Sequence, residues 1–135
     1  ICFFNFYKNF NSLIIILVFY LLFYLLPTIY IYLNYYKNSK NIKFKIDKFG
    51  ITKNGILYKV ENIKEIKFYM TSNKIKNSGL TYFSFECFYF AEINLLSSEK
   101  IIITNLFSSK IDDMLKYYFK DTPTTKVRTF YPIVK

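Results

Sequence analysis

The residue that could most directly do covalent chemistry is Cys87, because a cysteine thiolate is a strong nucleophile. The chain contains no histidine, the commonest general base at neutral pH, so no Ser-His or Cys-His pair can form. Cys87 also lies in a phenylalanine-rich stretch, where we expect a buried and unreactive cysteine. We therefore predict that the protein is not an enzyme, and a thiol-dependent enzyme using Cys87 is the alternative.

The sequence contains few residues that could support metal or cofactor chemistry. The other cysteine, Cys2, is 85 positions away from Cys87, which leaves no thiolate cluster for a metal ion. Three glycines are too few for a glycine-rich phosphate loop. The adjacent Asp112 and Asp113 are more simply the acidic first turn of a helix than a catalytic pair. We expect no cofactor and no metal site.

Lysine is the most abundant charged residue in the sequence. The chain has 19 Lys and Arg against 9 Asp and Glu, a formal net charge of +10. Such a charge attracts anionic lipid headgroups. A basic chain can also bind nucleic acid. Here the lysines are scattered and Arg128 is the single arginine, so few side chains could recognise bases. We do not expect nucleic-acid binding.

Two different parts of the chain must position these side chains, and the first is a membrane anchor in residues 1–34. Residues 13–33 form a run of 21 residues without a charge, about 32 Å long as a helix against a hydrocarbon core of about 30 Å. We predict one transmembrane helix there, with Pro27 carried as a kink. Residues 1–7 are interpreted as the end of an earlier crossing and 8–12 as a loop, so that the span is the second half of a helical hairpin. A cleavable signal peptide is the alternative, but its apolar core is about half as long.

The lysines indicate the orientation of this span. All but one of the basic residues follow it, and five lysines lie close behind it. Basic residues beside a span are retained on the cytoplasmic side. We therefore predict an integral protein of the cell inner membrane with a cytoplasmic C-terminal domain. Aromatic side chains near the end of the run are predicted to anchor it at the membrane interface, namely Tyr30, Tyr32, Tyr35 and Tyr36.

The second part is one small α+β domain over residues 42–121, joined by a polar linker at 35–41. Asn54-Gly55 predicts a type I′ hairpin turn between two short strands. Residues 71–79 are predicted as a polar loop, and 81–96 as one or two strands of which either face could be buried. Strands are predicted from alternating or β-branched residues at 42–46, 51–53, 56–60, 66–70 and 101–105.

Near the end of the domain, the spacing of the apolar residues changes from that of a strand to that of a helix. Ile111, Leu115 and Phe119 fall at helical spacing, which predicts an amphipathic helix. We predict that Ser109 caps this helix and that Thr122-Pro123 ends it, with acidic residues in the first turn. Residues 122–135 are interpreted as a C-terminal tail that either docks along the sheet or stays loose.

Successive strands followed by one C-terminal helix resemble the order found in bacterial membrane-anchored proteins with a pleckstrin-homology-like (PH-like) domain. The resemblance covers Ile42 to Phe119, with about six predicted strands where the family fold has seven. It implies an antiparallel β-sheet or barrel capped by the C-terminal helix. The residues that carry it are Phe44-Lys-Ile-Asp47, Gly50-Ile-Thr-Lys-Asn-Gly55, Val60-Glu-Asn-Ile-Lys-Glu-Ile66, Ile101-Ile-Ile-Thr-Asn-Leu106 and the closing helix.

The resemblance also implies a binding function. Lys43, Lys45, Lys48 and Lys53 are similar in placement to the basic positions with which some PH domains hold inositol phosphates, although simple solvation is the favoured explanation for lysines on an outer strand face. The predicted function is a non-enzymatic binding or scaffolding module for anionic lipid headgroups, another membrane protein or a second copy of itself. A regulatory or assembly subunit of a membrane complex is the alternative.

Overall fold

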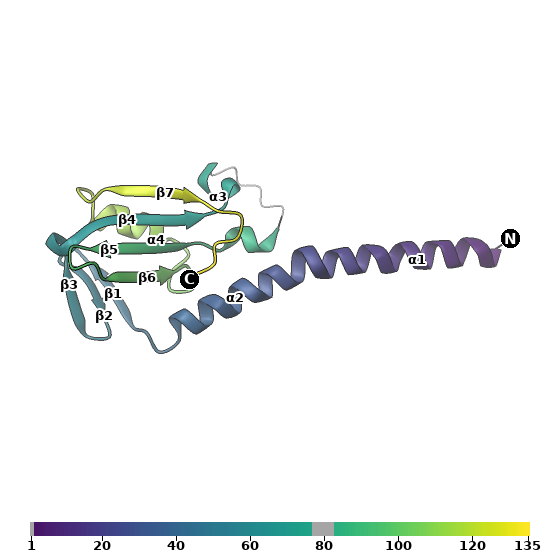
Figure 1. Cartoon of the computed structure of the whole chain (residues 1–135), viewed down its shortest axis with the longest axis horizontal. Coiled ribbons are helices and arrows are strands. Elements are labelled where there is room, and N and C mark those ends of the chain that lie inside the picture. Colours follow the sequence, from purple (N-terminus) through teal and green to yellow (C-terminus); the bar gives the residue numbers. More distant parts are fainter. Residues whose placement is uncertain (1, 77–82) are drawn as a thin grey trace.

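One uninterrupted helix opens the chain in the computed structural model, which describes residues 2–76 and 83–135 (Figure 1). It consists of α1 (Cys2–Tyr20), the π-helical turn η1 (Leu21–Leu25) and α2 (Leu26–Ser39). The π-helical turn lies next to Pro27, whose ring would clash with a backbone carbonyl in a regular helix. Where the sequence predicted a kink at Pro27, the helix accommodates the proline with one wider, π-helical turn.

Two predictions about this helix are wrong. Residues 8–12 form no loop, because α1 runs through them, and the predicted linker at 35–41 is helical as far as Ser39. A helix that is already nucleated gains one hydrogen bond for each residue it adds, so a few Asn and Ser residues do not stop it. In α2 the burial of Tyr35 against the domain adds tertiary packing. The helix ends where Asn41 adopts a left-handed conformation, with φ 66°.

A small antiparallel sheet follows, in the order β1-β2-β3. Asn54 and Gly55 connect β2 to β3 with positive φ angles of 50° and 87°, which confirms the predicted hairpin turn. Gly50 begins β2 with φ 149°, and a Cβ atom there would lie 2.0 Å from the carbonyl oxygen of Tyr58. Only glycine fits this position. The strands are β1 (Phe44–Asp47), β2 (Gly50–Lys53) and β3 (Ile56–Lys59), followed by the 3₁₀ turn η2 (Val60–Asn62).

The larger sheet has the strand order β6-β5-β4-β7. Its strands are β4 (Ile63–Met70), β5 (Phe90–Leu95), β6 (Lys100–Thr104) and β7 (Thr124–Arg128). The first three are antiparallel, whereas β7 pairs parallel to β4 and makes the sheet mixed. Among the described residues, six strands therefore precede α4 (Ile111–Tyr118), in agreement with the approximate number predicted. The seventh comes from the predicted tail, which docks because Thr124, Thr125 and Val127 suit a strand and can complete the free edge of β4.

The segment between β4 and β5 differs from its prediction. Ser72–Lys76 form the short helix α3 within the predicted loop, and Ser84–Cys87 form a 3₁₀ turn, η3, where a strand was expected. The carboxylate of Glu86 accepts hydrogen bonds from the backbone N–H of Phe83 at 3.3 Å and from the side-chain amide of Asn73 at 2.9 Å. These contacts favour a turn over a strand. The remainder of the predicted loop and strand, residues 77–82, lies outside the described residues.

The main core lies between the inner faces of the two sheets and the helix α4 (Ile111–Tyr118). The acidic residues occupy the first turn of α4 as predicted, but Ser109 does not cap it. Lys110 is the cap residue, and the carbonyl of Ser109 instead accepts a hydrogen bond from the hydroxyl of Tyr89 at 2.7 Å. The α+β class is confirmed. The largest buried members of this core include Ile51, Ile66, Phe68, Met70, Tyr89, Ile93, Ile101, Ile103, Ile111 and Phe119.

A second cluster fixes the long helix to the outer face of the larger sheet. Ile31 and Tyr35 of α2 are fully buried there against Phe85, Phe90 and Val134. The sequence left open which face of residues 81–96 is buried. In the structure, β5 is covered on both faces. The α+β domain therefore has α2 as one of its layers.

Hydrogen bonds hold α2 to the domain along its length. The side chain of Asn34 donates to the backbone carbonyl of Val134 at 3.0 Å and accepts from its N–H at 2.9 Å. The hydroxyl groups of Thr28 and Ser84 lie 2.8 Å apart, and those of Ser39 and Thr104 lie 2.7 Å apart. The domain is thus attached to the helix as one piece and is not suspended from a flexible linker.

Candidate functional site

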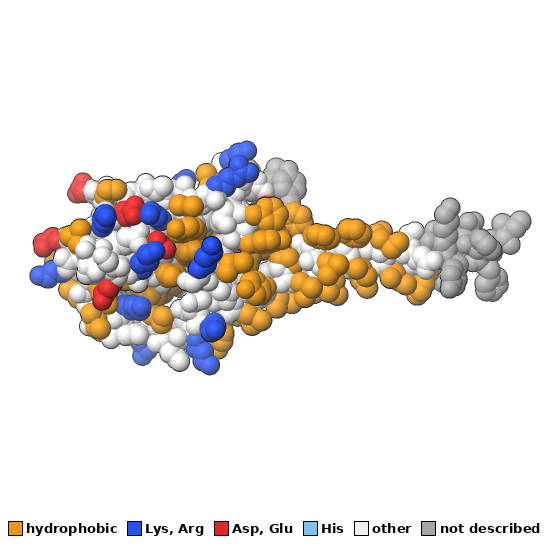
Figure 2. Space-filling view, in the orientation of Figure 1, with side chains coloured by type: hydrophobic (Ala, Val, Ile, Leu, Met, Phe, Trp, Pro, Cys, Tyr) orange, Lys and Arg blue, Asp and Glu red, His pale blue; other side chains and the backbone are white. Residues whose placement is uncertain are grey.

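Between Leu13 and Leu25, the helix that precedes α2 is covered by apolar side chains (Figure 2). Every side chain from Leu13 to Phe23 is at least 42% exposed. The helix over Phe10–Ser39 has a mean hydropathy of 2.5 in its most apolar window, so by length and composition it could cross a membrane. An exposed apolar surface of this extent is strongly unfavourable in water. We call residues 10–23 the bare helix segment.

The predicted interface anchors divide into two groups. Tyr35 does not face lipid, because its ring is fully buried and lies edge-on to Phe88 at 5.5 Å and to Phe90 at 6.2 Å. Its hydroxyl group has no hydrogen-bond partner among the described residues. The prediction is therefore wrong for Tyr35. Tyr30, Tyr32 and Tyr36 stay exposed, and their role as anchors stays a prediction.

The four lysines predicted as ligand contacts do not gather on one face. Lys43 and Lys45 flank Phe44 and are exposed, whereas Lys53 pairs with Phe44 in the register and shares its inward side. Lys48 lies in the turn at the other end of the hairpin, with its ammonium 5.0 Å from the ring centre of Phe49. The small sheet also lies at the end of the domain opposite the bare helix segment (Figure 1).

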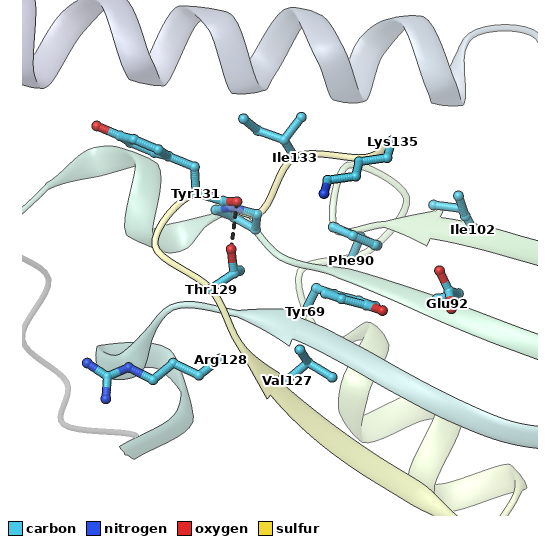
Figure 3. Close-up of a pocket in the computed structure, with 11 residues that line it drawn as sticks. Tyr69, Phe90, Glu92, Ile102, Val127, Arg128, Thr129, Tyr131, Ile133 and Lys135 are labelled. Carbon is cyan, nitrogen blue, oxygen red and sulfur yellow. Dashed lines mark hydrogen bonds between the residues drawn. The ribbon is translucent and has the colours of Figure 1, made fainter.

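A groove of about 410 Å³ crosses the outer face of the larger sheet, beside α2 and beneath the C-terminal segment 129–135 (Figure 3). The rings of Tyr69 and Phe90 stack at 4.7 Å and form part of its floor. Its volume falls within the range of ligand and peptide pockets. All four strands contribute to its lining, through Tyr69 from β4, Phe90 and Glu92 from β5, Ile102 from β6 and Val127 from β7.

The polar groups of this groove lie near its rim. Glu92 forms an ion pair with Lys100 at 3.4 Å, and Lys135 extends over the groove from the C-terminal segment (Figure 3). Arg128 points away from the groove, toward α3 (Figure 3). The hydroxyl of Thr129 donates to the carbonyl of Tyr131 at 2.8 Å and shapes the turn above the groove. This arrangement can bind an apolar group with a polar end, and its lining holds no nucleophile paired with a base.

A second, almost wholly apolar depression of about 370 Å³ lies between the helix and the same C-terminal segment. Leu26 and Tyr30 line it on the helix side, and Tyr131 and Ile133 line both it and the groove. Neither site was predicted from the sequence, because the position of the C-terminal tail was left open. The signal that could have revealed them is Phe130-Tyr-Pro-Ile-Val134, since a tail so rich in apolar residues must cover something.

Cys87 is exposed, contrary to the expectation of a buried cysteine. The 3₁₀ turn η3 carries it to the surface, where its carbonyl accepts a hydrogen bond from the side chain of Asn105 at 3.0 Å. Among residues 2–76 and 83–135, no group of three or more acidic, cysteine or histidine side chains is placed to hold a metal ion.

Titratable groups with shifted pKa values support the fold and lie outside the groove. Burial raises the pKa of Tyr89, whose hydroxyl also donates to the carboxylate of Asp112 at 2.8 Å. A hydrogen bond from the backbone N–H of Phe49 at 2.9 Å lowers the pKa of Asp47, and nearby Lys45 adds to this effect. Both arrangements fix connections between elements, which is a structural task.

A family model described as PH domain matches residues 1–112, which is more than four fifths of the chain. The matched region contains the long helix and the strands β1 to β6. No curated protein and no solved structure matches the chain.

Proposed function

The chain belongs to the PH domain family, and from this premise we propose that it is a non-enzymatic binding module anchored in the inner membrane, with its domain on the cytoplasmic side. In this proposal the helix as far as about Phe23 is the membrane anchor. Helix α2 and residues 42–135 together make the domain, so the anchor is shorter and the domain larger than the divisions at 34, 41 and 121 predicted from the sequence.

The observation that carries this proposal is the rigid attachment of α2 to the sheet. Ile31 and Tyr35 are fully buried against the domain, and Asn34 makes two hydrogen bonds to Val134. A domain held in this way cannot move far from the membrane that its helix enters. Its ligands must therefore come to the membrane surface, which favours a segment of another membrane-associated protein.

The groove suits an extended segment of such a partner. Its floor is apolar, and its rim carries one acidic and one basic side chain, Glu92 and Lys135. Beside it β7 is a terminal strand of the sheet, whereas the opposite terminal strand, β6, contacts α2. An added strand along β7 would give backbone hydrogen bonds, and side chains entering the groove would give specificity.

The lysines of the small sheet have a different part in this proposal. Lys43, Lys45, Lys48 and Lys53 lie at the end of the domain that faces away from the bare helix segment (Figure 1). Screening limits their attraction to lipid headgroups beyond about 10 Å. We therefore propose that the exposed Lys43, Lys45 and Lys48 contact acidic side chains of the same partner protein, in preference to the headgroups of the anchoring membrane.

Site-specific photocrosslinking in native membranes tests this proposal. A photoreactive phenylalanine analogue replaces Val127, which lines the groove on β7, or Ile56, an exposed residue of β3 that serves as the control. We expect Val127 to give one discrete protein adduct that Ile56 does not give. Adducts with lipid alone, or the same adducts from both positions, would contradict a protein partner in the groove.

A further inference from the structure

Five aromatic side chains from three distant parts of the chain form a continuous series of ring contacts. Tyr24 of the helix lies 6.4 Å from Phe83, and Phe83 lies 5.2 Å from Phe85, measured between ring centres. Phe85 lies 6.0 Å from Phe130 and 5.0 Å from Tyr131, which contact each other at 4.7 Å. We call Tyr24, Phe83, Phe85, Phe130 and Tyr131 the aromatic collar.

Most of this collar is not part of the core. Phe85 is buried, but Phe130 is 70% exposed, the largest value among the exposed large hydrophobic side chains of the described residues. Phe83 and Tyr131 are also exposed. Holding these rings together at the surface is costly in water and needs a favourable environment outside the domain.

Helix α1 extends away from the domain beyond η1 (Figure 1). Tyr24 of the collar lies in η1, and the exposed residues from Leu13 to Phe23 that precede it carry no charge. If the helix crosses the membrane up to this point, the collar lies at the depth of the headgroups, where aromatic side chains are favoured.

Basic side chains lie beside the collar. Lys74 and Lys76 are on α3, and α3 contacts both η3 and β7, whose last residue is Arg128. The side chain of Arg128 points toward α3 (Figure 3). The ammonium of Lys74 lies 4.7 Å from the ring centre of the buried Tyr89 and is already engaged there. Within the described part of the chain, Lys76 and Arg128 form no ion pair, so their charge is available to anionic headgroups.

We infer that the aromatic collar, with Lys76 and Arg128, docks the domain onto the lipid headgroup layer of the membrane that its own helix crosses. This inference rests on the proposed membrane anchoring. It adds a second membrane contact that fixes how the domain is turned about the helix. The groove, which shares Tyr131 with the collar, is thereby held next to the bilayer surface.

Tryptophan fluorescence can test the docking, because the chain contains no tryptophan. Three full-length variants are reconstituted in anionic vesicles with brominated acyl chains, which quench a nearby indole. Phe130→Trp reports on the collar and Phe19→Trp on the bare helix segment. Phe49→Trp is the matched control, because Phe49 is similarly exposed, at 65%, but lies in the β1–β2 turn at the opposite end of the domain.

We expect strong quenching at positions 130 and 19 and none at position 49. Quenching at position 19 with none at position 130 would overturn the docking and leave the anchoring intact. No quenching at position 19 would overturn the anchoring itself. Blue-shifted but unquenched emission at position 130 would show that protein, such as a second copy, covers the collar, and would also overturn the docking.

The contribution of charge is tested on the Phe130→Trp background. Lys76→Glu with Arg128→Glu should lose most of the extra quenching that anionic vesicles give over neutral ones. Lys48→Glu with Lys53→Glu makes the same change of charge at the far end of the domain and should keep it. Equal behaviour of the two pairs would overturn the role assigned to the basic side chains.

Discussion

The full-length chain carrying Gly50→Ala is expected to lose about 3 kcal/mol or more of the free energy of unfolding. Gly50 combines a φ angle of 149° with a backbone contact that leaves no room for a side chain, since an added Cβ would lie 2.0 Å from the carbonyl oxygen of Tyr58. Relief of this contact requires β2 and β3 to separate. Thermal unfolding in detergent micelles, followed by tyrosine fluorescence, measures the loss.

Gly55→Ala is the matched control for this change. Gly55 also has a positive φ, of 87°, but no atom lies within 4 Å of an added Cβ. The substitution therefore causes backbone strain alone, about 1–2 kcal/mol. Equal losses in the two variants would show that strain, and not the approach of β3, explains the glycine at position 50.

Ile31→Asp should separate the domain from its helix. Ile31 is fully buried in the second cluster, against Phe85, Phe90 and Val134. An unpaired carboxylate at this site costs roughly 4 kcal/mol, because no described neighbour in the cluster can neutralise it. In proteoliposomes we expect rapid proteolysis at Lys37 and Lys40, which the native packing of α2 protects.

Ile29→Asp makes the same substitution two residues earlier, on the opposite side of the helix. Ile29 is 43% exposed and does not belong to the cluster. If the hydrocarbon layer ends near Tyr24, an aspartate at position 29 lies outside it and should leave both insertion and proteolysis nearly unchanged. Loss of membrane insertion by Ile29→Asp would instead favour the longer span over 13–33 predicted from the sequence.

Local patterns predicted most of the fold correctly. The alternation of apolar and polar residues predicted the early strands, Asn54-Gly55 predicted the hairpin turn, and apolar residues at helical spacing predicted α4. These features are fixed by neighbouring residues, so a single sequence contains them. The 3₁₀ turn at Ser84–Cys87 was missed, although local hydrogen bonds between Phe83 and Glu86 support it, and a contact from Glu86 to the distant Asn73 adds to them.

The candidate site was harder to predict because it is built from long-range contacts. The sequence places Tyr35 beside Tyr36, but only the packing of the sheet decides that the first is buried and the second exposed. The groove requires β7 to pair parallel with β4, a partner more than fifty residues away. An apolar tail indicates that docking will occur, whereas its register depends on the free edge that the rest of the fold provides.

The structure also changes which basic side chains we expect to contact lipid headgroups. A net charge of +10 and a lysine-rich hairpin pointed to headgroup binding at Lys43, Lys45, Lys48 and Lys53. In the structure these lysines are divided between two faces and lie far from the bare helix segment. In the proposed docking, the side chains that contact headgroups are Lys76 and Arg128, which no sequence pattern distinguished from the other basic residues.

We propose above all that one helix crosses the bilayer and holds the PH domain directly on its cytoplasmic surface. The most direct test labels a single cysteine, Ser97→Cys in a chain that also carries Cys2→Ser and Cys87→Ser, with an impermeant maleimide in carbonate-washed membrane vesicles. Ser97 is exposed, in the turn between β5 and β6. We predict labelling in inside-out vesicles and none in right-side-out vesicles. Removal of the chain by carbonate, or labelling in intact right-side-out vesicles, would contradict the claim.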